Sequence, residues 1–339
     1  MLASSIRDVA RKAGVSVSTV SRAFNEYSDI KDDTKNRIFE VAKELGYVPN
    51  ISARNLSKKN KLNIAMIVSG FMQESDVDEF QFLLMKGAYG YAMDNSIEIA
   101  TYAIDSNYQK EKTYDQFCLE HSLSGALLLG LKTSDEYLKS LKDVQFPCVT
   151  VDVELEGDKL GNVLMEDQKA FQEITEYVLQ NNHRKLVLVY GKKEALVSRE
   201  RYMGFSKAIE EAGLSLETME IIYGEFSEAD AYKEARKLIE EKGKEFTAFV
   251  AMSDLMAIGV MRAIKDCGYK VPEDFSVTGF DGVNMAAYVE PAITTINQKV
   301  KKRGYAAVDL LMNIINGKAT AHKIVTEYEL VIRDSVKKI

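Results

Sequence analysis

The sequence contains no tryptophan and only three cysteines and three histidines among its 339 residues. The cysteines, Cys118, Cys148 and Cys267, lie among apolar neighbours and show no Cys-x-x-Cys spacing. This scarcity argues against a disulfide framework and a zinc site, because both need several cysteines or histidines at short, regular spacing. A reducing cytoplasm is the compartment that such a composition fits.

Long apolar segments are also missing. No run of eighteen apolar residues occurs, and Arg7 and Asp8 interrupt the start of the chain before any apolar stretch. A membrane-spanning helix needs about 20 apolar residues, and a secretory signal needs an apolar core after its basic start. We therefore expect a cytoplasmic globular protein that is neither exported nor embedded in a membrane.

The motifs of several common enzyme classes do not occur. The sequence has no Gly-x-Gly-x-x-Gly after a strand, no Gly-x-x-x-x-Gly-Lys-Ser/Thr, no His-Glu-x-x-His and no Gly-x-Ser-x-Gly. His121, His183 and His322 lie far apart in sequence. No catalytic residue, cofactor or metal site is predicted, although an α/β enzyme remains an alternative because such folds host many chemistries.

Positive charge is concentrated at one end of the chain. The formal net charge is −7, but residues 1–61 carry +5 and the remainder carries −12. A basic segment is attracted to phosphates, whereas an acidic body is repelled by them. This asymmetry favours docking on nucleic acid through the first 61 residues.

Residues 4–25 read as two short helices separated at Gly14. Ser5 followed by Asp8 forms an N-terminal capping pattern, and one helical face then carries Ile6, Val9, Ala10 and Ala13. Ser16 is placed to cap the second helix after the turn at Gly14. The pattern predicts a helix-turn-helix.

The second predicted helix separates its side chains by type. Val20, Ala23 and Phe24 face inward, whereas the outward residues are small, hydroxylated or cationic: Val17, Ser18, Ser21, Arg22 and Asn25. A third amphipathic run at 33–45 closes a three-helix core. The plainer alternative is a helical hairpin with a polar surface, but the outward side chains are of the types that contact DNA.

Four short motifs in this region occur together: Ile-Arg-Asp-Val-Ala, Gly-Val-Ser, Thr-Val-Ser-Arg and Leu-Gly-Tyr-Val-Pro-Asn. Together they resemble the headpiece of the lactose-repressor and galactose-repressor family of bacterial transcription regulators. The resemblance continues through nearly the whole chain. It implies a sequence-specific DNA-binding regulator, a repressor, whose operator affinity is changed by a small molecule.

A helix-turn-helix reads one half-site, so two copies related by symmetry must span about one helical turn, roughly 34 Å, to read a palindrome. We therefore expect a homodimer on double-stranded, two-fold operator DNA. Arg22 is the best candidate for a bidentate guanine contact, and Val17 and Ser18 are expected to set base preference. The residues expected mainly to hold phosphates are Ser16, Thr19, Ser21 and Asn25, with Ser5 and Asn50 completing the predicted DNA-binding set.

Pro49 stops the third helix, and residues 49–61 form a linker that contains a short predicted helix. Two turns of helix are too short to persist alone in water. By the resemblance, a partner subunit and the DNA minor groove support this hinge helix; Ala53 lies against the groove and Leu56 wedges into a base step. The alternative for Leu56 is an ordinary apolar contact in a tether.

From residue 62 onward, apolar runs alternate with amphipathic helices, including helices expected around 80–93 and 108–120. Continuous apolar runs such as 126–131 and 148–151 are typical of parallel strands buried on both faces. The pattern restarts after Gly161, which predicts two similar lobes. The fold class is therefore an all-α headpiece (1–48), a hinge (49–61) and an α/β body with parallel sheets (62–339).

By the resemblance, the body has the two-lobed fold of periplasmic sugar-binding proteins and ligand lies in the cleft between lobes. The chain is then expected to cross between lobes near residues 160, 291 and 321. This division assigns 62–160 and 292–320 to the first lobe and 161–291 and 321–339 to the second. Pro291 and Asn316-Gly317 are suitable crossing points.

The family's effector contacts are expected at Asp152, Arg201, Ser253 and Asp281, with Phe80 as a retained aromatic residue. A planar guanidinium such as that of Arg201 can fork across two hydroxyls or a carboxylate. The alternatives are a helix cap or surface charge for the carboxylates and an ion pair with Glu200 or Glu194 for Arg201.

The chemical class of the effector is inferred from the resemblance to the family. A carbohydrate effector is implied, although Ser253 and Gly282 replace polar residues that relatives carry, so the pocket differs from theirs. A phosphorylated carrier protein is an alternative signal, and residues 298–309 are one place for it. Lys299, Lys301, Lys302 and Arg303 in that segment are interpreted instead as a solvated helix start.

Overall fold

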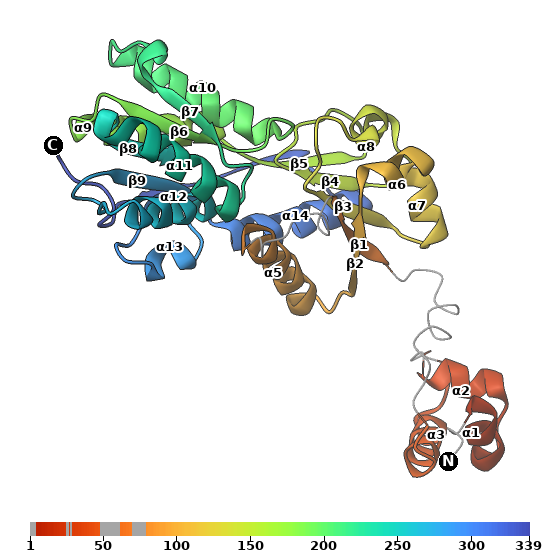
Figure 1. Cartoon of the computed structure of the whole chain (residues 1–339). Coiled ribbons are helices and arrows are strands. Elements are labelled where there is room, and N and C mark those ends of the chain that lie inside the picture. Colours follow the sequence, from red (N-terminus) through yellow and green to blue (C-terminus); the bar gives the residue numbers. More distant parts are fainter. Residues whose placement is uncertain (1–4, 25–26, 28, 48–61, 70–78) are drawn as a thin grey trace. The chain divides into compact units, whose positions relative to one another are not determined.

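The computed structural model describes residues 5–24, 27, 29–47, 62–69 and 79–339. The chain divides into two compact units, Met1–Leu62 and Asn63–Ile339. The first unit is here called the headpiece and the second the body. Figure 1 shows the helices of the headpiece and the two groups of strands in the body.

The described residues of the headpiece form three helices, α1 (Ile6–Ala13), α2 (Val17–Phe24) and α3 (Asp32–Glu44). One face of each helix contributes to a shared core of seven buried side chains: Val9, Ala10, Ala13, Val20, Ala23, Ile38 and Ala42. Phe24 is only partly buried, and its ring packs at 5.2 Å from that of Phe39 and at 5.8 Å from that of Tyr47. The predicted helix-turn-helix and its third helix are confirmed.

Local hydrogen bonds explain where α1 begins and ends. The Asp8 carboxylate accepts from the Ser5 backbone N–H at 3.0 Å and from the Ser5 hydroxyl at 2.6 Å. These hydrogen bonds hold the pKa of Asp8 below its ordinary value. Gly14 ends the helix with φ of 66°, a left-handed conformation that costs glycine little.

The first sheet of the body has the order β11-β5-β4-β3-β1-β2, and all of its pairings are parallel. Its strands are β1 (Ile64–Ser69), β2 (Ile99–Ile104), β3 (Gly125–Leu129), β4 (Cys148–Val151), β5 (Leu160–Met165) and β11 (Lys323–Thr326). The register places Ile64 opposite Ile99 on one side and Gly125 on the other. Every residue of β1, β3 and β4 is buried, which confirms the strands expected from apolar runs.

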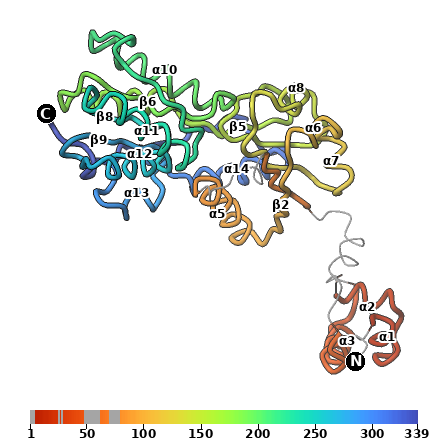
Figure 2. The backbone as a smooth tube through the Cα atoms, viewed as in Figure 1, coloured from red at the N-terminus to blue at the C-terminus, as the bar shows by residue number. Residues whose placement is uncertain are grey.

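The second sheet has the order β12-β10-β9-β8-β6-β7. Its strands are β6 (Leu186–Tyr190), β7 (Glu220–Tyr223), β8 (Ala248–Ala251), β9 (Ser276–Asp281), β10 (Thr294–Asn297) and β12 (Glu329–Val331). The short β12 pairs antiparallel with β10, and the other pairings in this sheet are parallel. The two sheets define the two lobes, which lie side by side in the body (Figures 1 and 2).

Helices cover both sheets. Those of the first lobe are α5 (Glu79–Asp94), α6 (Ser106–Glu111), α7 (Tyr114–Glu120), α8 (Glu136–Ser140) and α14 (Val300–Ile315). Those of the second are α9 (Asp167–Gln180), α10 (Leu196–Glu211), α11 (Glu228–Lys242), α12 (Asp254–Asp266) and α13 (Met285–Tyr288). Phe280 on β9 stacks on Phe171 of α9, whereas the adjacent Gly279 faces Asp254 of α12. Since neighbouring strand residues point to opposite faces, α9 and α12 lie on opposite sides of the sheet.

Helices α5 and α14 pack closely against each other, and α14 also contacts strands β3, β4 and β5 of the first sheet (Figures 1 and 2). A Cβ atom added to Gly304 of α14 would lie 1.9 Å from the Leu84 carbonyl oxygen of α5. Only glycine permits this approach of the two backbones. Helix α14 therefore holds a fixed position between α5 and strands β3, β4 and β5.

Each of the three predicted crossings between lobes is placed one short strand too early in the chain. Strands β5 and β11, assigned to the second lobe, pair in the first sheet, and β10, assigned to the first lobe, pairs in the second sheet. Pro291 precedes β10 and Asn316-Gly317 precedes β11, so each lies one strand before the crossing itself. Gly161 lies inside β5, where a Cβ atom would meet Leu310 at 2.8 Å, so this glycine serves packing against α14.

The single helix expected at 108–120 is two helices, α6 and α7. The Thr113 hydroxyl accepts from the Gln116 backbone N–H at 3.3 Å, and the Gln116 side chain accepts from the Thr113 N–H at 3.0 Å. This reciprocal capping box begins α7 as a separate helix.

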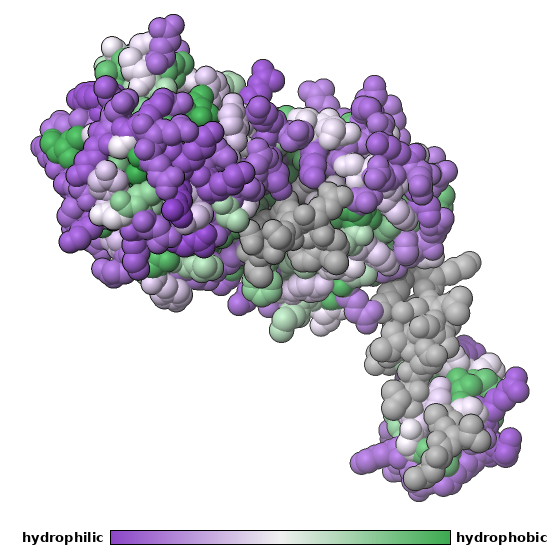
Figure 3. All heavy atoms as spheres, in the orientation of Figure 1, coloured by the Kyte–Doolittle hydropathy of each residue, from purple (hydrophilic) through white to green (hydrophobic). Residues whose placement is uncertain are grey.

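The surface in view is mostly hydrophilic, with hydrophobic residues in small scattered groups (Figure 3). Within the described ranges, no helix combines the length and the apolar character that crossing a bilayer requires. None of the three cysteines, all of which the structure describes, forms a disulfide bond.

Candidate functional site

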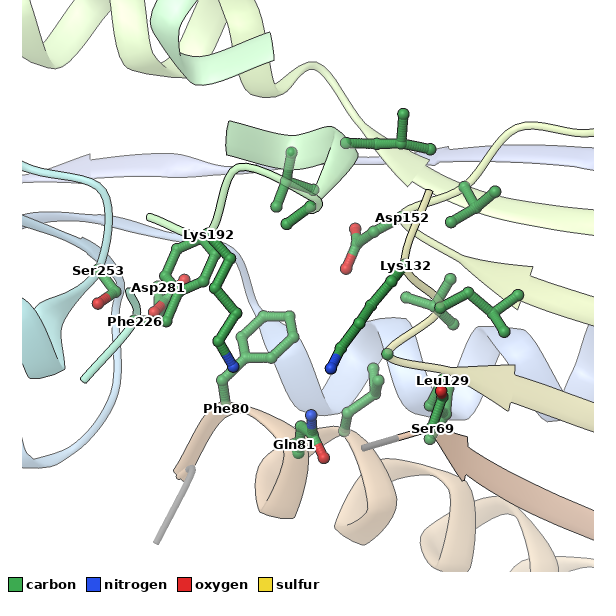
Figure 4. A pocket seen from close by; sticks show the side chains of 18 of the residues that line it. Ser69, Phe80, Gln81, Leu129, Lys132, Asp152, Lys192, Phe226, Ser253 and Asp281 are labelled. Atoms are coloured by element: carbon green, nitrogen blue, oxygen red, sulfur yellow. The ribbon is translucent and has the colours of Figure 1, made fainter. Parts of the chain in front are cut away.

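A cavity of about 170 Å³ lies between the two lobes of the body. All five residues predicted as effector contacts line it: Phe80, Asp152, Arg201, Ser253 and Asp281. They come from both lobes and from positions as distant in sequence as 80 and 281. Figure 4 shows the labelled members converging from both sides of the space.

Parallel strands place three of these side chains. Asp152 follows β4 and Ser253 follows β8 after a short gap, while Asp281 is the last residue of β9. Because the carboxyl ends of parallel strands share one edge of a sheet, side chains there gather at a common cleft. The Ser253 hydroxyl also accepts from the Met256 backbone N–H at 3.2 Å and so caps α12.

Arg201 on α10 is buried and held by several acceptors. Its Nε donates to Asp167 at 2.8 Å, and its terminal nitrogen donates to the Met252 carbonyl at 2.6 Å. The same nitrogen lies 3.8 Å from the Asp281 carboxylate. The guanidinium also lies 3.9 Å from the centre of the Phe280 ring. The ion-pair partners are therefore Asp167 and, at the longer distance, Asp281, and not Glu200 or Glu194 as the alternative had it.

Arg303 on α14 extends this charged network into the first lobe. Its side chain is fully buried, and its two terminal nitrogens donate to Asp152 and to the Gln298 side chain. The Gln298 amide in turn donates to Asp281 at 2.7 Å. Asp152 and Asp281, from different lobes, are thus joined through Arg303 and Gln298. The interpretation of Arg303 as part of a solvated helix start is wrong.

Three residues of the cavity adopt a backbone conformation that most side chains avoid. Asp152 has φ of 64°, Phe226 has φ of 57° and Asp281 has φ of 112°. Positive φ is uncommon outside glycine and costs of order 1–3 kcal/mol. Such strain persists where the surrounding structure fixes a side chain in a particular direction. Its concentration around one cavity supports a functional site there.

Asp254, the neighbour of Ser253, is fully buried outside the cavity lining. Burial raises the pKa of Asp254 to about 7, against the opposing effect of hydrogen bonds from Thr295 and from the Val283 N–H. These two donors lie 2.5 and 2.9 Å from its oxygens. Asp254 therefore ties the start of α12 to β10 and to the loop after β9.

The prediction missed several residues of the lining, among them Ser69, Gln81, Lys132, Lys192 and Phe226. Ser69 ends β1, and both lysines follow strand ends. The tendency of side chains at the carboxyl ends of parallel strands to line a cleft was therefore a usable indication for these three residues. For Arg303, the helical spacing of the apolar residues around it indicated that its side chain lies on the buried face of α14. It lies three residues after Val300 and four before Ala307, both buried.

The histidines take structural positions. His183 lies between the Thr247 hydroxyl at 2.9 Å and the Lys337 carbonyl at 3.0 Å, and burial lowers its pKa. His322 contacts the Leu160 carbonyl at 2.7 Å, and His121 stacks against Phe117. None of the three lines the cavity. Among the described residues, no group of three or more His, Cys, Asp or Glu is arranged to hold a metal ion.

The second candidate surface is the outer face of α2. Val17, Ser18 and Arg22 are exposed there, and Thr19 and Ser21 are half-buried. The Ser16 hydroxyl caps the helix by accepting from the Thr19 N–H at 3.1 Å. Arg22 forms an ion pair with Asp29, and its guanidinium lies 5.5 Å from the centre of the Tyr27 ring. Of the other predicted DNA contacts, Ser5 is exposed, and Asn25, Asn50, Ala53 and Leu56 lie outside the described residues.

Comparison with known families gives two matches. Residues 5–50 match the family described as bacterial regulatory proteins, lacI family. Residues 175–336 match the periplasmic binding protein-like domain. The first match contains α1, α2 and α3, and the second contains most of the second lobe.

Curated relatives match over nearly the full length. The HTH-type transcriptional regulator MalR of Clostridium butyricum is 32% identical over 336 residues, covering 97% of this chain and 98% of the relative. The HTH-type transcriptional repressor PurR of Aliivibrio fischeri is 28% identical and covers 98% of each chain.

Solved structures share the fold. The Lac repressor dimer bound to operator and the anti-inducer ONPF superposes with a TM-score of 0.85 at 23% identity, covering 98% of this chain and 99% of that one. The complex of the transcriptional regulator CelR with cellobiose has a TM-score of 0.72 at 24% identity, with the same coverage. A lacI-family regulator from Enterococcus faecium with bound ribose has a TM-score of 0.70 at 20% identity and covers 81% of this chain and 99% of that one.

Proposed function

The chain belongs to the lacI family of bacterial regulatory proteins, and we propose that it represses transcription from a two-fold operator under the control of a carbohydrate ligand. Membership in a family of transcriptional regulators sets the enzyme alternative aside. The observation that carries the ligand proposal is the convergence of five predicted contacts on one cavity between the lobes. The cytoplasm is the proposed site of action.

The carbohydrate class rests on two supports. Structural neighbours hold cellobiose and ribose, and the cavity combines aromatic with hydrogen-bonding side chains. Phe80 and Phe226 present rings to the space, which suit the apolar face of a sugar (Figure 4). Asp152 and Asp281 supply acceptors for hydroxyl groups, and the guanidinium of Arg201 lies at the same surface.

The proposed regulatory mechanism rests on hydrogen bonds that link the two lobes. Arg303 and Gln298 join Asp152 of the first lobe to Asp281 of the second. A ligand that competes for either carboxylate changes the contacts between the lobes and so favours one of their arrangements. We propose that this rearrangement is transmitted to the headpiece through residues 49–61, with Asn50, Ala53 and Leu56 contacting the minor groove.

A homodimer is the proposed DNA-binding form, because a two-fold operator needs two headpieces. Large apolar side chains suited to a subunit contact are exposed on two helices of the body. On α5, Met93 and Phe82 are 82% and 59% exposed, and on α13, Tyr288 and Met285 are 84% and 46% exposed. Burial of such side chains at an interface removes apolar surface from water.

The proposal is tested by titrating the full-length protein onto DNA fragments from upstream of its own gene, with and without a sugar panel. We expect one fragment to bind specifically and one sugar to change that affinity at least tenfold, a coupling within the usual range. A sugar that binds without changing DNA affinity would contradict the regulatory role. An effect obtained only with a phosphorylated carrier protein would replace the carbohydrate with that alternative partner.

A further inference from the structure

Glu79, the first residue of α5 in the first lobe, contacts the second lobe directly. One oxygen of its carboxylate accepts from the Asn284 backbone N–H at 3.3 Å and from the Asn284 side-chain amide at 3.0 Å. The other oxygen accepts from the Met285 backbone N–H at 3.4 Å. Asn284 and Met285 lie at the start of α13. A single side chain of one lobe therefore forms three hydrogen bonds with the other.

These hydrogen bonds supply acceptors that the start of α13 needs. The first N–H groups of a helix have no acceptor within that helix. Asn284 is the N-cap residue, and within the described part of the chain its side chain forms no capping hydrogen bond. A carboxylate suits this position, because hydrogen bonds from backbone N–H groups to a charged oxygen are stronger than those between neutral groups. Glu79 thus caps a helix of the opposite lobe.

The lobes also meet at a second place, between the loops that follow β3 and β6. The Thr133 backbone N–H of the first lobe donates to the Glu194 carbonyl of the second at 3.0 Å. Close to it in sequence, Leu196 at the start of α10 packs against the hydrophobic core of the first lobe. This contact and the contact of Glu79 both join segments that stay within one lobe. Both must therefore break when the lobes separate, whereas the crossing segments remain joined through the backbone.

Both ends of the Glu79 contact are close in sequence to residues of the cavity. Phe80 directly follows Glu79, and Asp281 precedes Asn284 by three residues. Phe80 and Asp281 line the cavity from different lobes (Figure 4). A change in the position of either side chain is therefore passed to the hydrogen bonds between Glu79 and α13.

We infer that Glu79 is an interlobe latch, a side chain whose hydrogen bonds favour the arrangement of the lobes that encloses the cavity. This role belongs to the body alone and goes beyond the proposed function, because it requires neither DNA nor an effector. Removing the carboxylate should raise the population of separated lobes about tenfold. This value is at the low end for hydrogen bonds to a charged group, because Glu79 is only half-buried.

Amide hydrogen exchange of the full-length protein, resolved to single residues by mass spectrometry, tests this role. The decisive amide is that of Thr133, which is bonded across the lobes in the contact that Glu79 does not touch. In Glu79→Ala, exchange at Thr133 should be about tenfold faster, because each separation of the lobes breaks its hydrogen bond. A residue that only capped α13 would affect exchange at Asn284 and Met285 and leave Thr133 as it was.

A pair of substitutions tests the contact from both sides. Asn284→Asp places a second carboxylate against Glu79, and the repulsion should accelerate exchange at Thr133 by at least the same factor. Adding Glu79→Gln to Asn284→Asp allows the glutamine amide to donate to the introduced carboxylate while its oxygen accepts from the backbone. The rate at Thr133 should then return to within about threefold of that of the unaltered protein.

Glu228→Ala is the matched control. Glu228 is also half-buried and is also the first residue of its helix, α11, but it forms an ion pair with Arg262 inside the second lobe. Its removal should leave exchange at Thr133 unchanged. The buried strand β1 is the internal reference, and its amides should exchange at the same rates in every variant.

Unchanged exchange at Thr133 in Glu79→Ala would overturn the latch, as would an equal acceleration in Glu228→Ala. Failure of the double variant to restore the rate would show that Glu79 and Asn284 do not act on the lobes through their contact. Faster exchange in β1 as well as at Thr133 would identify general destabilisation of the body and would equally count against the latch.

Discussion

Replacing Arg22 with alanine should lower affinity for the specific operator about 100-fold, because a bidentate arginine–guanine contact contributes roughly 1–3 kcal/mol of base discrimination. Arg22 is exposed in the last turn of α2, the helix whose outer face carries Val17 and Ser18. The substitution removes no buried contact, so the headpiece core and the body should remain folded. Fluorescence anisotropy with labelled operator and mutated-operator duplexes measures the change.

The ion pair with Asp29 and the nearby Tyr27 ring support this assignment of Arg22. They hold the guanidinium on the exposed side of the headpiece, which reduces the number of conformations it must give up on binding DNA. Arg37→Ala is the matched control, because it removes an exposed arginine from α3. It should change affinity for operator and mutated duplexes equally. An Arg22→Ala protein that binds the operator within twofold of the unaltered protein would show that another residue reads the bases.

Arg303→Ala should destabilise the body by about 3–5 kcal/mol, the usual result of removing one partner from a buried ion pair. The Arg303 side chain is fully buried, and Asp152, its partner, is 21% exposed. Without the guanidinium, Asp152 and the Gln298 side-chain oxygen lose their donors, and the smaller side chain leaves a cavity in the body. Urea denaturation followed by far-UV circular dichroism measures the free energy of unfolding.

Lys302→Ala provides the control for Arg303, because it removes a neighbouring charge that is exposed on the same helix. Its free energy of unfolding should change by less than about 0.5 kcal/mol, as for most surface substitutions. Arg303→Met keeps much of the side-chain volume and separates the loss of charge from the loss of packing. If Arg303→Ala were as stable as Lys302→Ala, the network joining Asp152 to Asp281 would not hold the lobes.

Features set by short stretches of sequence could be predicted well. The capping pair of Ser5 and Asp8 and the turn at Gly14 depend on residues only a few positions apart, and the structure contains both. Continuous apolar runs identified buried strands of the first sheet for a similar reason, since burial on two faces removes the need for alternation. The resemblance to the family indicated Asp152 and Asp281, and the parallel arrangement explains why both lie at strand ends beside one cavity.

Features set by contacts across the chain could not be predicted in the same way. Glycine is common in turns, so the sequence pattern suggested a break at Gly161. Its position inside β5 instead follows from close contact with Leu310, which lies far along the chain. Arg303 follows three lysines within four residues, and this cluster of charge alone suggests that its side chain is exposed to solvent. Only its spacing from Val300 and Ala307 on the buried side of α14 indicates otherwise. Lys132 and Lys192 are ordinary loop residues until the two lobes bring them to the same space.

The central claim, that this chain binds a two-fold DNA site through α2, is tested most directly by selection from a random DNA library. The full-length protein is incubated with the library at near-physiological salt, bound DNA is recovered through several rounds, and the recovered sequences are aligned. The account predicts an inverted repeat whose half-sites are centred about 10 base pairs apart and contain a guanine lost from the consensus with Arg22→Ala. Recovery of no common sequence, or of the same sequence with Arg22→Ala, would contradict it.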